Sequence, residues 1–202
     1  MTVDLSRFGP RASAISQYVD ILASRGIERG LIGPREADRI WERHILNSIA
    51  VSDLIPVGSD VADVGSGAGL PGIPLALFRP DLRMTLVEPL LRRFTFLTEV
   101  VEELGLQEQV VARRSRADEL DDRFDVVTAR ALAPLSRLLT WCADLVRPGG
   151  QILAIKGQTA AGEIAESAPY LRRRRLTAEL LTVRADVNAE PTAVVRVAFP
   201  SP

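Results

Sequence analysis

The sequence predicts an α/β fold: a mostly parallel seven-stranded sheet with helices on both faces and an N-terminal helical cap. Three observations support this prediction. From residue 60 onward, short and nearly all-apolar segments alternate with helical segments, as in a parallel sheet that is covered on both sides. A glycine-rich loop joins the first of these strands to a helix. Before residue 60 the apolar residues follow a helical spacing, and no strand pattern is present.

Length and composition fit an ordinary globular protein, with 202 residues, 47% of them hydrophobic and 25% charged, and a formal net charge of −1. A chain of this length can bury roughly 70% of its unfolded surface. Its one cysteine, Cys142, excludes a disulfide framework and a cysteine-based zinc site, and we expect no metal. No apolar stretch approaches the roughly 18–20 residues that span a bilayer, and residues 1–4 lack the pattern of a signal peptide. We therefore expect a cytoplasmic protein without membrane contact.

The N-terminal region, residues 1–59, is the predicted helical cap. Its apolar positions have helical spacing from about residue 10 to residue 56, and Gly26 and Gly30 interrupt the pattern. A second helix is predicted after Pro34. The remaining residues, 60–202, form the predicted sheet domain.

The sheet domain contains seven predicted strands, each marked by an apolar run. The predicted strands lie at 61–64, 84–87, 110–112, 124–128, 151–155, 180–183 and 193–199. Predicted helices follow the first, second, fourth and fifth strands, at the segments from residue 71, up to residue 105, from 134 to 145, and from 161 to 175. The Pro-Gly-Gly triplet at 148–150 predicts a sharp turn before the fifth strand.

Gly65, Gly67 and Gly69 lie in the loop that follows the first predicted strand. Glycine is needed where the backbone takes a positive φ or where a ligand approaches it closely. The helix that begins near Pro71 would direct its free N–H groups and its positive dipole end toward this loop. Because ligands of open α/β sheets bind beyond the carboxyl ends of the strands, the loop predicts a nucleotide-type cradle. The alternative is a glycine-rich turn without a ligand.

The spacing of the loop separates two kinds of nucleotide. A dinucleotide fingerprint needs a glycine three residues after the second one, but Leu70 occupies that position. Asp63, two residues before Gly65, suits a ligand with a cationic portion. Glu88 ends the second strand, where a carboxylate can accept hydrogen bonds from ribose hydroxyls. The combination resembles the Rossmann-like class I S-adenosylmethionine-dependent methyltransferases. An NAD(P)-binding oxidoreductase or redox sensor is the alternative, and the Leu70 spacing argues against it.

Further motifs carry a narrower resemblance. The stretch 63–75, Asp-Val-Gly-Ser-Gly-Ala-Gly-Leu-Pro-Gly-Ile-Pro-Leu, and the stretch 43–48, Arg-His-Ile-Leu-Asn-Ser, resemble motifs of the 16S ribosomal RNA guanine-7 methyltransferases, also called the glucose-inhibited division protein B family. The segments 115–117, 129–131 and 156–158 also match in type, order and spacing. The resemblance covers about residues 35–200. Asn47 stands where the family usually has Asp, and a Trp-Asn-x-x-x-Asn-Leu-Thr stretch of the family is missing around residues 28–34.

This resemblance implies S-adenosyl-L-methionine as the cofactor and 7-methylguanosine, at guanine 527 of the 16S RNA in standard bacterial numbering, as the product. Together with the glycine loop it implies a set of cofactor-binding residues: Gly65, Gly67, Gly69, Leu70, Glu88, Ala117, Asp118 and Arg130. A non-catalytic ribosome assembly factor on the same fold is the remaining alternative.

Methylation of guanine N7 places modest demands on side chains. This nitrogen is a lone-pair nucleophile with no proton to lose, so no general base is required. Positioning can then supply most of the rate, roughly 7–11 kcal/mol for a well-aligned pair. Arg130 and Lys156, at the ends of the fourth and fifth strands, are the candidate catalytic residues. Arg130 could donate to guanine O6, to a phosphate or to the cofactor carboxylate, and the alternative is a structural pair with Asp63 or Asp125.

RNA contact must come from local clusters, because the net charge is close to zero. Lys156, the only lysine of the chain, could meet a phosphate, and a solvated strand-end lysine is the alternative. The other candidate RNA-binding residues are Arg43, His44, Arg113, Arg114 and Arg116. For His44 the alternative is a packed, hydrogen-bonded helix histidine. We expect a monomer that acts on 16S ribosomal RNA within the small ribosomal subunit, with salt-sensitive affinity.

Overall fold

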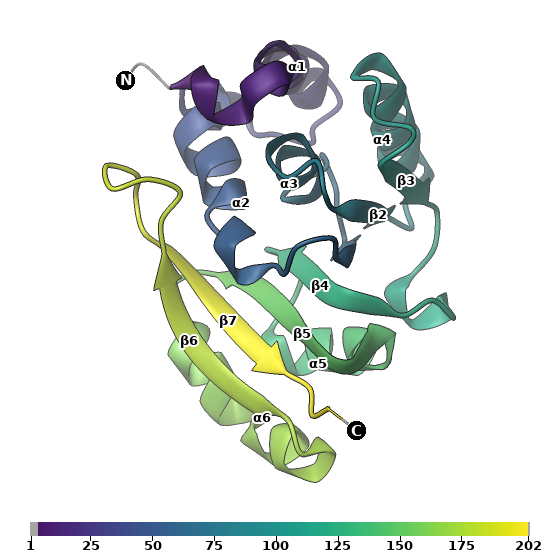
Figure 1. The fold of residues 1–202 in the computed structure, drawn as a ribbon, viewed down its shortest axis with the longest axis vertical. Coiled ribbons are helices and arrows are strands. Elements are labelled where there is room, and N and C mark those ends of the chain that lie inside the picture. The colour runs from purple at the N-terminus through teal and green to yellow at the C-terminus, as the bar shows by residue number, and fades with distance from the viewer. Residues whose placement is uncertain (1–3, 202) are drawn as a thin grey trace.

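The computed structural model describes residues 4–201, so residues 1–3, on which the expectation about a signal peptide partly rests, lie outside the described part. One seven-stranded sheet with the order β3-β2-β1-β4-β5-β7-β6 forms the centre of the molecule (Figure 1). β1 to β5 are parallel, whereas β7 runs antiparallel to both of its neighbours, β5 and β6. The predicted mostly parallel seven-stranded sheet is confirmed.

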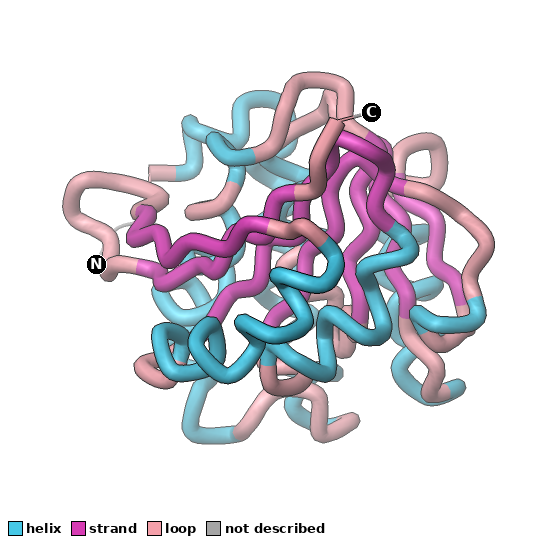
Figure 2. Tube along the Cα trace, turned by 90° about the horizontal axis from the view of Figure 1, so that it is seen from below, coloured by secondary structure: helices cyan, strands magenta, loops and turns pink. Residues whose placement is uncertain are grey.

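All seven predicted strands are present. They are β1 Asp60–Val64, β2 Arg83–Val87, β3 Val110–Arg113, β4 Phe124–Arg130, β5 Val146–Lys156, β6 Thr177–Val183 and β7 Thr192–Ala198. The α-helices are α1 Ala12–Ile21, α2 Asn47–Ile49, α3 Gly72–Phe78, α4 Leu91–Glu103, α5 Leu135–Cys142 and α6 Ala160–Arg174. The helices lie on both sides of the single layer of strands (Figure 2).

The N-terminal region is helical as predicted, and it continues the packing of one sheet face. Besides α1 and α2 it contains the 3-10 helix Pro34–Arg39 and the π-helical turns Ile40–Leu46. Ile15 and Ile45 from this region belong to the same buried cluster as Ile73 of α3 and Leu86 of β2. A second buried cluster joins the other face of the sheet to α5 and α6. The helical region and the sheet therefore share one apolar core.

The start of β5 differs from the prediction of a sharp turn at residues 148–150. This triplet lies inside β5, which begins at Val146 and has an irregular register against β4 between Phe124 and Val126. Gly149 N–H donates to Pro200 O and Gly150 O accepts from Phe199 N–H, each at 3.0 Å. A Cβ at Gly150 would lie 2.6 Å from Asp125 O. The glycines are thus required by the close approach of the C-terminal segment to Gly149 and of β4 to Gly150, long-range effects that the local turn chemistry did not reveal.

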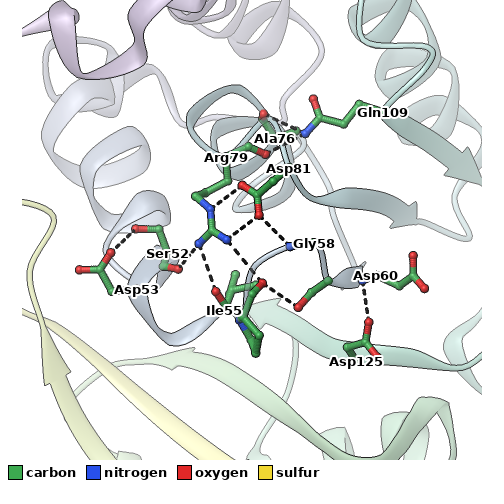
Figure 3. Close-up of polar contacts among 12 residues, drawn as sticks. Ser52, Asp53, Ile55, Gly58, Asp60, Ala76, Arg79, Asp81, Gln109 and Asp125 are labelled. Carbon is green, nitrogen blue, oxygen red and sulfur yellow. Dashed lines mark hydrogen bonds and ion pairs between the residues drawn. The ribbon is translucent and has the colours of Figure 1, made fainter.

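At the amino ends of the strands, one arginine fastens the helical region to the sheet (Figure 3). Arg79, after α3, donates from Nε and Nη2 to the two carboxylate oxygens of Asp81, both at 2.7 Å. Its Nη1 donates to Ser52 O at 2.8 Å and to Ile55 O at 3.1 Å. Asp81 also accepts from Gly58 N–H at 2.9 Å. This network pins the linker before β1 against the end of α3.

The order of the strands determines where a ligand can bind. β1 pairs with β2 on one side and with β4 on the other, so the crossover direction of the sheet reverses at β1. In open α/β sheets the connections diverge at such a point and leave a crevice at the carboxyl ends of the strands. The glycine loop after β1 and the end of β4 both lie there. Within residues 4–201, no helix is long and apolar enough to cross a membrane.

Candidate active site

The glycine loop folds back onto the end of β2. Gly65 and Gly67 have φ values of 71° and 57°, the left-handed region that favours glycine. The N–H groups of Gly65 and Ser66 donate to Val87 O at 2.9 and 3.2 Å. From the cap, the buried Tyr18 donates its hydroxyl to Ala68 O at 2.8 Å. The loop is therefore held from β2 and from α1, with a conformation that other residues adopt only under strain.

Glu88 binds the backbone of the glycine loop through its carboxylate. Its carboxylate is buried, with only 2% of the residue exposed. One oxygen accepts from Gly67 N–H at 3.1 Å and the other from Leu90 N–H at 3.0 Å, and Arg93 Nη1 lies 3.9 Å away. The carboxylate thus stands at the end of β2, where the sequence placed it. In this structure its partners are backbone amides.

Asp63 has a role that the sequence did not indicate. Its side chain is fully buried and accepts from Gly72 N–H at 3.0 Å and from the hydroxyl of Thr128 at 3.3 Å. Burial raises the pKa of Asp63 to about 6, although these hydrogen bonds oppose the shift. The interpretation of Asp63 as a partner for a cationic ligand is therefore wrong. The carboxyl instead ties β1 and β4 to the first turn of α3.

A pocket of about 810 Å³, hereafter the cleft, opens at the carboxyl edge of the sheet. The glycine loop, the segment 131–134 after β4, the end of β5 and the helical region around residues 31–47 form its walls. Leu132 of the segment 131–134 packs on the glycine loop, since a Cβ at Gly65 would lie 2.4 Å from Leu132 Cδ1. The predicted residues Arg43, His44, Gly65, Gly67, Leu70, Arg130 and Lys156 all line the cleft.

Arg130 is the last residue of β4 and joins the sheet to the helical region. Its Nη1 donates to Arg43 O at 3.1 Å and to Asn47 Oδ1 at 3.3 Å, and its Nη2 donates to His44 Nδ1 at 2.5 Å. The proposed structural alternative, a pair with Asp63 or Asp125, is absent among the contacts of the described residues. Burial lowers the pKa of the Arg130 guanidinium. The guanidinium is thus a largely desolvated cation whose hydrogen-bond partners are all uncharged.

His44 is buried, with 3% of the residue exposed, and both ring nitrogens have partners. Nε2 lies 3.0 Å from Glu36 Oε2, and Nδ1 faces Arg130. The alternative expected for this residue, a packed and hydrogen-bonded helix histidine, describes its environment. It nevertheless lines the cleft.

Lys156, at the end of β5, is neither solvated nor free. Only 9% of its side chain is exposed, and its ammonium group donates to Ala133 O at 2.5 Å and pairs with Glu163 Oε2 at 2.7 Å. Glu163 also accepts from Leu135 N–H at 2.7 Å and from the Thr159 hydroxyl at 2.8 Å. This buried pair holds the segment 131–134 against the start of α5.

The other predicted residues lie outside the cleft lining, among them the buried Glu88, which reaches the cleft only through its hydrogen bond to Gly67 N–H. Ala117 is buried against the second core cluster, and Asp118 beside it is exposed and pairs with Arg116 at 3.2 Å. Gly69, at the end of the glycine loop, faces α3, since a Cβ there would lie 2.4 Å from Ile73 Cδ1. Arg113 and Arg114, like Arg116, are exposed at the carboxyl end of β3.

Three charged residues of the cleft lining were missed by the sequence analysis: Glu36, Arg93 and Glu163. Glu36 and His44 are eight residues apart and lie in two successive helical segments, the 3-10 helix and the π-helical turns, so the spacing of neighbours on one helix does not predict their contact. Glu163 follows Lys156 across a turn, and Arg93 follows the predicted Glu88 in the first turn of α4. At neither position does the neighbouring sequence have a pattern that predicts a place in the cleft. Over residues 4–201, no group of three or more His, Cys, Asp and Glu side chains could hold a metal ion.

The reversal of strand order at β1, the glycine loop and the carboxylate at the end of β2 together define a class I S-adenosylmethionine-dependent methyltransferase. Solved structures share this fold. The Bacillus subtilis M1A22 tRNA methyltransferase TrmK superposes with a TM-score of 0.59 over 77% of this chain and 66% of that chain, at 16% identity.

Sequence comparison narrows the class to a family. The chain is 50% identical, over all of its length and 87% of the relative, to the ribosomal RNA small subunit methyltransferase G of Nocardioides sp.. It is 58% identical to the protein of the same name from Mycobacterium leprae, over 78% of this chain and 65% of the relative. The model of the GidB family, described as rRNA small subunit methyltransferase G, matches residues 11–184. The chain belongs to the GidB family, which decides against the oxidoreductase.

Proposed function

We propose that this protein transfers a methyl group from S-adenosyl-L-methionine to N7 of a guanine, guanine 527, in 16S ribosomal RNA. The family membership supports the cofactor and the RNA class. The observation that carries the chemistry is the cleft, where Arg130 offers a cation at the carboxyl edge beside the glycine loop. In the described part of the chain, the only histidine has both ring nitrogens engaged and offers no free base. A lone-pair nucleophile such as N7 requires none.

The residues present fit the proposed cofactor. A Cβ at Gly67 would meet no atom closer than Gly65 O at 3.9 Å, so the backbone there borders open space that a ligand can fill. Glu88 accepts a hydrogen bond from Gly67 N–H at 3.1 Å, and its carboxylate could exchange this amide partner for ribose hydroxyls. When bound, the cofactor supplies an electrophilic methyl group on a sulfonium. The chain supplies orientation of the reactants and exclusion of water.

The proposed cofactor residues keep their assignments. We propose that the cofactor contacts Gly65, Gly67, Gly69, Leu70, Glu88, Ala117, Asp118 and Arg130. For RNA we propose Arg43, His44, Arg113, Arg114, Arg116 and Lys156. Arg130 and Lys156 remain the proposed catalytic residues, Arg130 in the sense that it touches cofactor or guanine. Lys156 forms a buried pair with Glu163 and holds the segment 131–134 in the wall of the cleft. We propose that this segment contacts RNA and that Lys156 acts through it.

A guanine analogue provides the sharpest test of N7 as the acceptor. The enzyme is incubated with tritiated cofactor and with reconstituted small subunits that carry either guanosine or 7-deazaguanosine at position 527. We expect label in 7-methylguanosine with the first particle and none with the second, because carbon replaces the nucleophilic nitrogen. Equal labelling of both particles would place the methyl group elsewhere and overturn the proposal. Binding of the particle without any transfer would favour an assembly factor.

We propose further that the substrate is the small subunit particle rather than free RNA, and that the protein acts as a monomer in the cytoplasm. In this proposal residues 1–59 form a cap over the substrate side of a methyltransferase domain at 60–202. A net charge of −1 provides little long-range attraction to RNA, so a target loop held in shape by the particle should matter more than charge. Initial rates on particles should therefore exceed those on deproteinised RNA, and should fall as salt rises. Equal rates across a salt series would contradict this part of the proposal.

A further inference from the structure

We propose that His44 is a positioning residue, which as a neutral imidazole accepts a hydrogen bond from Arg130 and donates one to Glu36, and so fixes the Arg130 guanidinium at the wall of the cleft. We call these three residues the relay. The inference deepens the proposed function and rests on it, because there Arg130 is the residue that faces cofactor or guanine. His44 itself touches neither reactant in this role.

Hydrogen-bond chemistry determines the tautomer of His44. A guanidinium has donors only, so His44 Nδ1, 2.5 Å from Arg130 Nη2, must accept and cannot carry a proton. A carboxylate has acceptors only, so Nε2, 3.0 Å from Glu36 Oε2, must carry the proton. Both conditions are met by one state, the neutral imidazole protonated on Nε2. The carboxylate of Glu36 therefore fixes the tautomer that Arg130 needs.

The other partners of Arg130 make this contact important. They are the uncharged oxygens of Arg43 and Asn47, and the described residues give Arg130 no ion pair. The Asn47 amide is itself oriented, because its nitrogen donates to the Thr192 hydroxyl at 2.8 Å and leaves its oxygen toward Arg130. A guanidinium held by three neutral acceptors has no carboxylate in direct contact, and Asp63 and Glu36 act on it only from a distance. That charge remains available to a ligand in the cleft.

Protonation of His44 would break the relay. An imidazolium offers no acceptor at Nδ1 and would set two cations against each other in a buried place. The charged groups that face His44 are Arg130 from β4, Arg43 from its own helical turn and Glu36 from the preceding one; Asp63 and Tyr18 face Arg130 from β1 and α1. Burial and Arg130 lower the pKa of His44, and Glu36 opposes them. The relay is therefore intact at neutral pH and fails in acid.

The chain contains a single histidine, so its ring nitrogens can be observed directly. We would label the full-length protein with ¹⁵N-histidine and follow the two ring signals by NMR from pH 8 to pH 4. We expect the Nε2-protonated tautomer at pH 7 and a pKa below the ordinary value. Glu36→Gln keeps an acceptor for Nε2–H but removes the negative charge, so it should lower the pKa further, by about one unit. Arg130→Met should raise the pKa.

Glu42→Gln is the matched control, because it removes the same charge from an exposed position two residues before His44. It should leave the titration of His44 unchanged. An Nδ1-protonated ring, an imidazolium at pH 7, or equal titration of the wild type, Glu36→Gln and Arg130→Met would each overturn the relay. These measurements need neither cofactor nor RNA. They report on the relay even if the proposed function fails.

The positioning role is tested by the pH profile of methyl transfer to small subunits. The wild-type rate should fall tenfold per pH unit below the pKa of His44. In Glu36→Gln this acid limb should move to lower pH by the same shift that NMR records, whereas Glu42→Gln should leave it in place. A relay that NMR confirms but an acid limb that does not move would refute the positioning role. Transfer at pH 7 by the same proteins would leave the proposed function standing.

Discussion

Arg79 and Arg130 fasten the same helical region to the two opposite ends of the sheet, but they differ in how their charge is compensated. Arg79, at the amino edge, has a bidentate contact with Asp81 in addition to three backbone carbonyls. Arg130, at the carboxyl edge, has a carbonyl, an amide and a neutral imidazole. At the amino edge the arginine charge is neutralised by a carboxylate in direct contact. At the carboxyl edge the arginine has no such partner, and its charge is available to a ligand in the cleft.

The carboxylates of the two edges show the same difference. Hydrogen bonds from Arg79 hold the pKa of Asp81 well below its usual range, whereas burial raises the pKa of Asp63 to about 6. Paired charges at the amino edge stabilise the fold. Poorly compensated groups gather near the cleft, as they do where a protein uses charge for binding or chemistry.

The largest expected effect separates the two arginines. Arg130→Met should lower the rate of methyl transfer by at least about 100-fold, because a misplaced reactant forfeits that much, while stability changes by only about 1 kcal/mol. Arg79→Met should lower the free energy of unfolding by about 2 kcal/mol, since it leaves Asp81 and several carbonyls without a donor, and should keep the activity of the folded fraction.

Urea unfolding and a single-turnover assay on each variant measure the two effects. The comparison between the edges would be refuted by the opposite assignment, in which Arg79→Met abolishes transfer by folded protein or Arg130→Met loses the greater part of the stability.

The second prediction concerns pH. Between about pH 4 and pH 6 the folded state holds a proton on Asp63 that the unfolded state has lost, so this group makes stability fall as pH rises through that window. A shift of two pKa units corresponds to at most about 3 kcal/mol. Asp63→Asn should remove this slope, because an amide does not titrate in this range. The amide oxygen can still accept from Gly72 N–H, so the fold should be kept.

Asp81 should show the opposite sign. Its lowered pKa contributes stability above its ordinary pKa of 3.8 that is lost as pH falls. Asp81→Asn should therefore be destabilising at pH 7 and nearly neutral in strong acid. Denaturant unfolding at a series of pH values decides both cases. A difference from the wild type that stays constant with pH, for either variant, would contradict the assignment.

The sequence was sufficient for elements whose signal is local. Apolar runs located all seven strands, and the loop at 65–69 and Glu88 were placed correctly at the carboxyl ends of β1 and β2. Contacts between distant segments had no such signal. Arg130 and His44 are 86 residues apart, and whether a strand-end arginine meets a ligand, a carboxylate or an imidazole depends on how the helical region docks. The partner of Lys156 could not be predicted for the same reason: nothing in the local pattern showed that α6 would bring Glu163 to it.

The third prediction tests whether the open edge accepts the cofactor at Gly67. Gly67→Val adds a side chain in the open space of the loop and should weaken cofactor binding by at least about tenfold, or about 1.4 kcal/mol. Gly105→Val is a matched control, because Gly105 also has a positive φ and open space but lies at the end of α4. Both variants should lose similar stability, and only the first should lose affinity in calorimetric titration. Equal affinities would mean that the loop is only a turn.

The smallest expected effect concerns the exposed arginines. Arg113 ends β3, and its carbonyl accepts from Glu88 N–H at 3.0 Å, so its backbone is fixed beside the glycine loop while its side chain is exposed. Such a group can neutralise a phosphate but contributes little more. Arg113→Gln and Arg114→Gln should each weaken binding of small subunits only a few-fold and lower the slope of log affinity against log salt by about 1.

Arg123→Gln removes the same charge from an exposed arginine that precedes β4, at the amino edge of the sheet. If RNA approaches only the carboxyl edge, this control keeps both the affinity and the salt slope of the wild type. Filter binding across a salt series at fixed pH measures all three variants. Equal losses from Arg113→Gln and Arg123→Gln would show that the particle senses net charge alone, and that the two edges of the sheet do not differ as an RNA-binding surface.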